Sequence, residues 1–179
     1  MNRFTIVGLP RSRTSWLSVF LTWQTSFCVH EPMRLERYGK VHIYPKDTEY
    51  FGVSDSTLSM FPEEISDDSR VVIIYRDPNE VRASLCDAIG FDCDNVVNVC
   101  SSGLKIIAAG MDHMAVKFDD IDNRLFDIWS YCVPGLLFPR KRVQELIRLN
   151  VEPCIDISKT LMEVTPERLE AIRIRLEGA

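Results

Sequence analysis

The sequence FTIVGLPRSRTSW, residues 4–16, joins an apolar run to a helical pattern through one short loop. The run at 4–7, closed by Gly8, is typical of a buried strand, and residues 14–24 place aromatic side chains at helical spacing. A loop that enters a helix directly from a strand turns its backbone N–H groups towards the helix N-terminus, where anions bind. This stretch therefore predicts a strand–loop–helix unit that holds a phosphate-like group.

The rest of the chain alternates between strand and helix patterns. Residues 70–75, RVVIIY, contain five apolar residues in a row, which suits a parallel strand covered on both faces. Asp77 as N-cap, Pro78 at the first helical position and Glu80 three residues past the cap predict the start of a helix. Further strands are expected at 51–55, 114–118 and, at an edge, 151–157, and helices at 77–90, 95–109, 139–150 and 165–177. This alternation predicts an α/β fold with a mainly parallel sheet.

The composition is that of one soluble globular domain spanning residues 1–179. This length suffices to bury a core, and 46% of the residues are hydrophobic and 26% charged. The net charge of −5 argues against nucleic-acid and membrane-surface partners, because such binding depends on excess positive charge. The six cysteines form no C-x-x-C pair, and no secretory signal or long apolar span is recognisable. We therefore expect free thiols, no metal site and a cytoplasmic location.

The loop at 8–15 has the length of a Walker phosphate loop but lacks its chemistry. In the pattern G-x-x-x-x-G-K-[ST], Arg13 stands at the second glycine and Thr14 at the lysine that reaches the β- and γ-phosphates. The strand at 70–75 is followed by Arg76 rather than by an acidic residue that could hold Mg²⁺. An ATPase or a kinase is therefore disfavoured, and arginine side chains must meet the anion.

Two segments together resemble a known enzyme family. PRSRTSW, residues 10–16, is similar to the 5′-phosphosulfate loop of sulfotransferases, P-[KR]-[ST]-G-T-[TS]-x-[LW]. IIYRDPNEVRASL, residues 73–85, is similar to their 3′-phosphate motif, an apolar strand followed by R-[DN]-P-x-[DE]-V-x-x-S. Arg76 and Ser84 are eight residues apart, which places the serine about two helical turns beyond the strand end. The chain thus resembles a short, bacterial or phage-type sulfotransferase.

This resemblance implies a three-layer P-loop-type fold with a central, mainly parallel sheet flanked by helices. It implies 3′-phosphoadenosine 5′-phosphosulfate as donor, no metal, and a hydroxyl or amine on a small-molecule or glycan acceptor. Arg11 would stabilise the bridging oxygen, since catalysis of such a transfer is mainly alignment and charge stabilisation. The residues that would bind the donor are Pro10, Arg11, Ser12, Arg13, Thr14, Ser15 and Trp16 in the loop, with Arg76 and Ser84 at the 3′-phosphate.

A general base must take the proton of the acceptor. Glu31 follows the first helix, where some members of the family place a catalytic glutamate, and we expect it to serve ahead of His42 and His30. The structural alternative for Glu31 is a carboxylate that pairs with Arg34. Residues 54–56, SDS, stand where some members carry a lysine.

Arg13 departs most from the family pattern because it replaces a glycine. If the backbone there needs a positive φ, a non-glycine residue costs roughly 1 kcal/mol. We expect Arg13 to add a second positive charge for the transferred group; a loop that has lost activity is a further alternative. The sequence leaves open a non-catalytic, sulfotransferase-like interaction protein and a P-loop phosphotransferase, and it does not define the oligomeric state.

Overall fold

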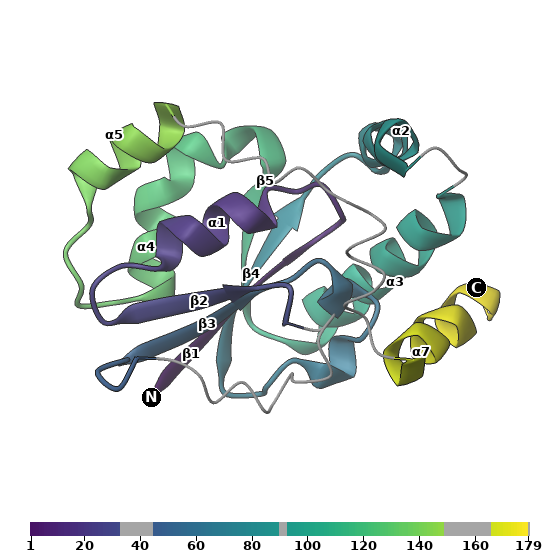
Figure 1. Ribbon diagram of the computed structural model, residues 1–179, viewed down its shortest axis with the longest axis horizontal. Coiled ribbons are helices and arrows are strands. Elements are labelled where there is room, and N and C mark those ends of the chain that lie inside the picture. The colour runs from purple at the N-terminus through teal and green to yellow at the C-terminus, as the bar shows by residue number, and fades with distance from the viewer. Residues whose placement is uncertain (33–44, 90–92, 149–165, 179) are drawn as a thin grey trace.

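The computed structural model describes residues 1–32, 45–89, 93–148 and 166–178, which contain an all-parallel sheet of five strands (Figure 1). The strands are β1 (Asn2–Gly8), β2 (Ser26–His30), β3 (Tyr50–Ser54), β4 (Ser69–Tyr75) and β5 (His113–Lys117). Their order across the sheet is β2-β3-β1-β4-β5, so the first strand lies at the centre. The predicted α/β class with a parallel sheet is confirmed.

Helices pack against both faces of this sheet (Figure 1). One face is covered by α1 (Thr14–Leu21), α4 (Leu125–Cys132) and α5 (Arg140–Arg148). The other face is covered by α2 (Pro78–Ile89) and α3 (Asp94–Gly110), against which α7 (Pro166–Glu177) packs. Short 3-10 turns occur at η2 (Thr57–Ser59), η3 (Pro62–Glu64), η4 (Phe118–Asp120) and η5 (Asp122–Arg124). No helix among the described residues is long and apolar enough to cross a membrane.

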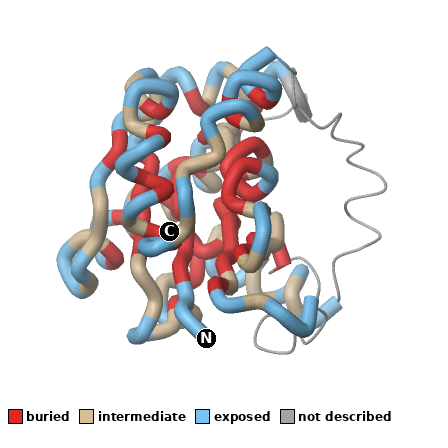
Figure 2. The backbone as a smooth tube through the Cα atoms, turned by 90° about the vertical axis from the view of Figure 1, so that its left-hand side faces the viewer, coloured by how far each residue is buried: buried red, intermediate tan, exposed pale blue. Residues whose placement is uncertain are grey.

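The buried part of β4 is apolar because each of its faces contributes to a separate core. In β4, Val72 and Ile74 pack with α1 and α4, whereas Val71 and Ile73 pack with α2 and α3. All four side chains are fully buried. Buried residues accordingly gather along the middle of the molecule in Figure 2. The continuous run at 70–75 therefore has the cause that the sequence suggested, a strand covered on both sides.

Most of the predicted elements agree with the structure. The Asp77 carboxylate accepts the amide of Asn79 at 2.7 Å, which confirms the predicted N-cap of α2. The first helix ends at Leu21 instead of residue 24, and Trp23 lies beyond it with 38% of its surface exposed. β2 and α4 were not predicted. The expected strand at 151–157 lies outside the described residues.

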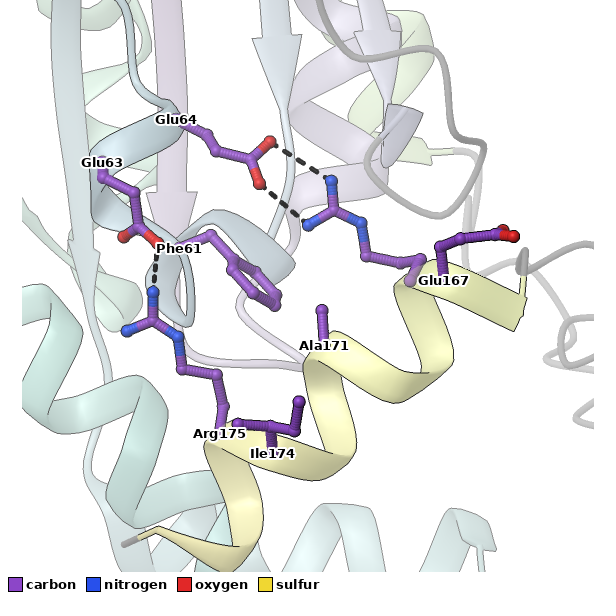
Figure 3. A pocket seen from close by; sticks show the side chains of 8 residues that line it. Phe61, Glu63, Glu64, Glu167, Ala171, Ile174 and Arg175 are labelled. Atoms are coloured by element: carbon purple, nitrogen blue, oxygen red, sulfur yellow. Dashed lines mark hydrogen bonds and ion pairs between the residues drawn. The ribbon is translucent and has the colours of Figure 1, made fainter.

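Charged side chains connect the C-terminal helix to the body of the protein (Figure 3). The buried ring of Phe61 lies between the guanidinium groups of Arg168 and Arg175, at 4.8 and 5.2 Å. Arg168 also forms a two-point ion pair with Glu64 at 2.9 and 3.2 Å, and Arg175 pairs with Glu63. None of the residues of α7 is fully buried. These ion pairs and cation–π contacts add to the packing of Ala171, Ile172 and Leu176, which are partly buried against the core.

Candidate anion-binding and catalytic site

The loops after β1 and β4 both start at the carboxyl-terminal edge of the sheet, and they lead to helices on opposite faces of it. β1 continues into α1 on one face, and β4, which pairs with β1 in parallel, continues into α2 on the other face. Open parallel sheets bind ligands where two adjacent connections diverge in this way. The two motifs singled out from the sequence meet at this point.

The loop after β1 has the backbone of an anion-binding nest. Arg11 has φ 65° and Arg13 has φ 60°, and Ser12 between them has no positive φ. Alternation of this kind turns successive backbone N–H groups towards one centre. A left-handed conformation costs about 1–2 kcal/mol for a residue other than glycine, and such strain is concentrated at functional sites. The condition raised for Arg13, a positive φ, is therefore met.

Two further features shape this loop. A Cβ on Gly8 would lie 3.0 Å from the carbonyl oxygen of Ile74 and 3.2 Å from Cβ of Ser12, so a side chain at Gly8 would crowd the turn. Ser12 is fully buried, and its Oγ has no hydrogen-bond partner among the described residues. Arg13 provides no side-chain cap for α1, which leaves the first amides of that helix for another acceptor. The loop thus offers donors for which the described residues provide no acceptor, as a site for a phosphate or sulfate group requires.

The arginine and serine of the second motif contact the first motif directly. Nε of Arg11 donates to Oγ of Ser84 at 3.1 Å, and Arg76 donates from Nη1 to the carbonyl oxygen of Arg11. The Arg76 guanidinium lies 4.1 Å above the ring of Phe118, and its Nε is 3.5 Å from Oε2 of Glu80. Only 17% of the Arg76 side chain is exposed. Arg76 and Ser84 lie 65 and 73 positions from Arg11 in the sequence. The three residues therefore form one cluster with two positive charges.

The expected general base lies on the other side of the loop. Oγ of Ser15 is 3.1 Å from Nε2 of His30, which in turn is 3.7 Å from Oε1 of Glu31. Ser56 donates to the same Glu31 oxygen at 3.2 Å. Glu31 has φ 47° and a side chain that is 12% exposed. These contacts bring Glu31 and His30 together at the start of α1. His42 and Arg34, the alternative base and the alternative ion-pair partner, lie outside the described residues.

Other predicted donor residues are engaged by the protein itself. Nη1 of Arg13 pairs with Oδ1 of Asp122 at 2.9 Å, and its guanidinium lies 4.8 Å above the ring of Trp16. Trp16 is 5% exposed and donates its indole N–H to the carbonyl of Leu146 at 3.3 Å. Trp16 is therefore a core residue that can reach a ligand only through its backbone. Pro10, at the start of the loop, is partly exposed.

Residues 54–56, SDS, follow β3 and support the neighbouring loop by hydrogen bonding. Ser54 donates to the carbonyl of Thr14 at 2.8 Å, and the fully buried Asp55 accepts the amide of Thr57 at 2.7 Å. Asp55 directly follows β3, the neighbour of β1, so a carboxylate does end an apolar strand at this edge. The pattern FGVSD contains this signal, but the Mg²⁺ prediction refers only to the strand at 70–75. Asp122 and Phe118 were not predicted either, because no local pattern connects them with the arginines.

None of the described cysteines is among the residues that form these contacts. The described cysteines are free thiols, in agreement with the sequence prediction: Cys28, Cys86, Cys93, Cys100 and Cys132. Burial raises the pKa of the Cys100 thiol to about 11, which makes it a weak nucleophile. Within the described ranges, no group of three or more His, Cys, Asp or Glu side chains is arranged to hold a metal ion.

No protein-family model matches the sequence, and no curated protein does. The resemblance to sulfotransferases consequently rests on the two sequence motifs alone.

Proposed function

We propose that the protein is a sulfotransferase that moves a sulfuryl group from 3′-phosphoadenosine 5′-phosphosulfate to a hydroxyl or amine acceptor. The fold would then be of the three-layer P-loop type, with the donor loop following the central strand β1. The strand order and the placement of helices on both faces support this assignment. The acceptor would be a small molecule or a glycan.

The contact of Arg11 with Ser84 and Arg76 is the observation that carries the proposal. The two motifs were found separately in the sequence, and in the structure their side chains touch at the edge of the sheet. A donor with phosphate groups at both the 5′ and the 3′ position needs two adjacent anion sites. The left-handed loop and the Arg76–Ser84 pair provide two such sites at hydrogen-bonding distance from Arg11.

Each residue then has a role that follows from its position. The backbone N–H groups of the loop and the unpartnered Oγ of Ser12 bind the 5′-phosphate, and Arg76 and Ser84 bind the 3′-phosphate. Arg11 stabilises the charge that develops on the leaving phosphate oxygen. Glu31, oriented by Ser56, accepts the proton of the acceptor. The donor supplies an activated sulfuryl group, so the protein contributes alignment and charge.

A phosphotransferase is the second candidate, because Asp55 lies at the end of β3 beside the loop. A buried carboxylate at this position can hold Mg²⁺ against a nucleotide. The absence of a lysine in the loop sequence counts against this function. We therefore rank sulfuryl transfer first and include Mg²⁺ with ADP as a competing ligand in the test.

Thermal unfolding in the presence of three ligands tests the proposal. We expect 3′,5′-adenosine bisphosphate, without metal, to stabilise the protein by about 2.7 kcal/mol at 100 times its dissociation constant. For a chain of this size that corresponds to a rise in Tm of roughly 5–11 °C. AMP at the same concentration as the bisphosphate should have a smaller effect, because it lacks the 3′-phosphate and binds more weakly. Equal shifts with AMP, or a shift only with ADP and Mg²⁺, would contradict the proposal. Formation of the bisphosphate from the donor in a panel of alcohols, amines and glycans then tests turnover.

A further inference from the structure

The arginine that replaces the family glycine is connected to a distant segment of the chain. Arg13 donates from Nη1 to Oδ1 of Asp122 at 2.9 Å, across 109 residues of sequence. Asp122 is the first residue of η5, in the connection from β5 to α4. That connection follows the carboxyl end of β5, so it starts from the same edge of the sheet as the loop.

We propose that Asp122 is a counter-ion that competes with the bound anion for Arg13 and so sets the affinity of the loop for its ligand. The inference rests on the proposed function, because it takes the loop after β1 as the site of the donor 5′ group. In the ligand-free protein Asp122 holds the guanidinium of Arg13. A phosphate or sulfate group in the loop takes that guanidinium from it.

The contact between the two side chains is one that an anion can replace. The Arg13 side chain is 28% exposed and that of Asp122 is 54% exposed, and ion pairs so open to solvent are weak. The one hydrogen bond between them uses Nη1, whereas a guanidinium has five N–H donors. A phosphate or sulfate group can accept two parallel bonds from such a fork. The Trp16 ring, 4.8 Å from the guanidinium, keeps Arg13 beside the loop in either state.

The surroundings of Asp122 strengthen this competition. The sequence from 117 to 127, KFDDIDNRLFD, holds four aspartates and two basic residues. One of these basic residues, Arg124, is already paired with Asp127 at 2.6 Å. The connection therefore places excess negative charge next to an anion-binding loop. Removing one of these charges at Asp122 both frees Arg13 and lowers the repulsion.

The variant Asp122→Asn tests the inference by isothermal titration with 3′,5′-adenosine bisphosphate. We expect the dissociation constant to fall about two- to fivefold, the range that corresponds to one exposed ion pair. The matched control is Asp127→Asn, which removes a similar ion pair with Arg124 in the same connection. The side chains of Arg124 and Asp127 are 36% and 51% exposed. The dissociation constant of this control should change clearly less than that of Asp122→Asn, because Asp127 pairs with Arg124 and not with Arg13. Thermal unfolding should show that both variants fold.

The same substitution in an Arg13→Ala background shows whether Asp122 acts through Arg13. The gain in affinity should then be clearly smaller than in the wild type. An unchanged or weaker affinity of Asp122→Asn, or an equal gain without Arg13, would overturn the inference. If the wild type does not bind the bisphosphate, the proposed function fails, and inorganic pyrophosphate becomes the probe for the effect of Asp122 on the loop. Binding of neither compound would overturn both.

Discussion

Replacing Arg76 with alanine tests two roles that the structure and the proposed function give to one side chain. Arg76 donates to the carbonyl oxygen of Arg11, so it supports the loop at a left-handed residue. The proposed function also assigns it to the 3′-phosphate. Its side chain is fixed by the Phe118 ring, 4.1 Å from the guanidinium, and by Oε2 of Glu80, 3.5 Å from Nε. The substitution should therefore weaken different ligands by different amounts.

The expected magnitudes separate the two roles. Loss of a charge-assisted hydrogen bond to the 3′-phosphate costs about 1.5–3 kcal/mol, or roughly ten- to a hundredfold in affinity for the bisphosphate. AMP lacks that group and loses only the support of the loop, which is about 0.5–1.5 kcal/mol, or roughly two- to tenfold. The fold should lose about 1–3 kcal/mol, because the ring contact and the ion pair with Glu80 disappear as well.

Titration calorimetry with both ligands measures these losses, and denaturant unfolding measures stability. Arg82→Ala is a suitable control, because Arg82 lies on the same helix and pairs with Asp94 at 2.7 Å, away from the loop. It should lower stability slightly and leave both affinities unchanged. If Arg76→Ala weakens the two ligands equally, Arg76 only supports the loop. If it weakens neither, the assignment of Arg76 to the 3′-phosphate is wrong.

Three further predictions concern the base, the loop and the packing of α3. Glu31→Gln should leave bisphosphate binding intact and lower turnover by roughly 10²–10⁴, whereas unchanged turnover would transfer the role of base to a histidine. Arg13→Gly should change the free energy of unfolding little, because about 1–2 kcal/mol of relieved backbone strain offsets the lost ion pair and ring contact. The same variant should lower donor affinity by at least roughly tenfold, and full affinity would show that Arg13 takes no part in binding. Gly103→Ala should lower the free energy of unfolding by about 1–3 kcal/mol or more, because the new Cβ would lie 1.7 Å from the carbonyl oxygen of Ser59. Gly110→Ala, whose Cβ meets no atom within 4 Å, is its control and should not destabilise the protein.

The elements that the sequence predicted are those with a strong local signal. β4 contains five apolar residues in a row, and α2 begins at an Asp–Pro pair with a glutamate in its first turn. β2, SFCVH, has five residues of mixed polarity, and it becomes a strand by pairing with β3. Such a segment is stabilised by its neighbour rather than by its own propensity, and for that reason it was not predicted.

The candidate site likewise has features that local sequence predicts and contacts that only the folded structure shows. The sequence by itself determined the α/β class, the loop after β1 and the two motifs that carry Arg11, Arg76 and Ser84, because each depends on residues close together in the chain. Only the tertiary structure decided that Arg13 pairs with Asp122 and that Trp16 belongs to the core. These contacts follow from the order of the strands and from the packing of helices on each face. Both depend on pairings between segments far apart in the chain, which the pattern of any one segment does not specify.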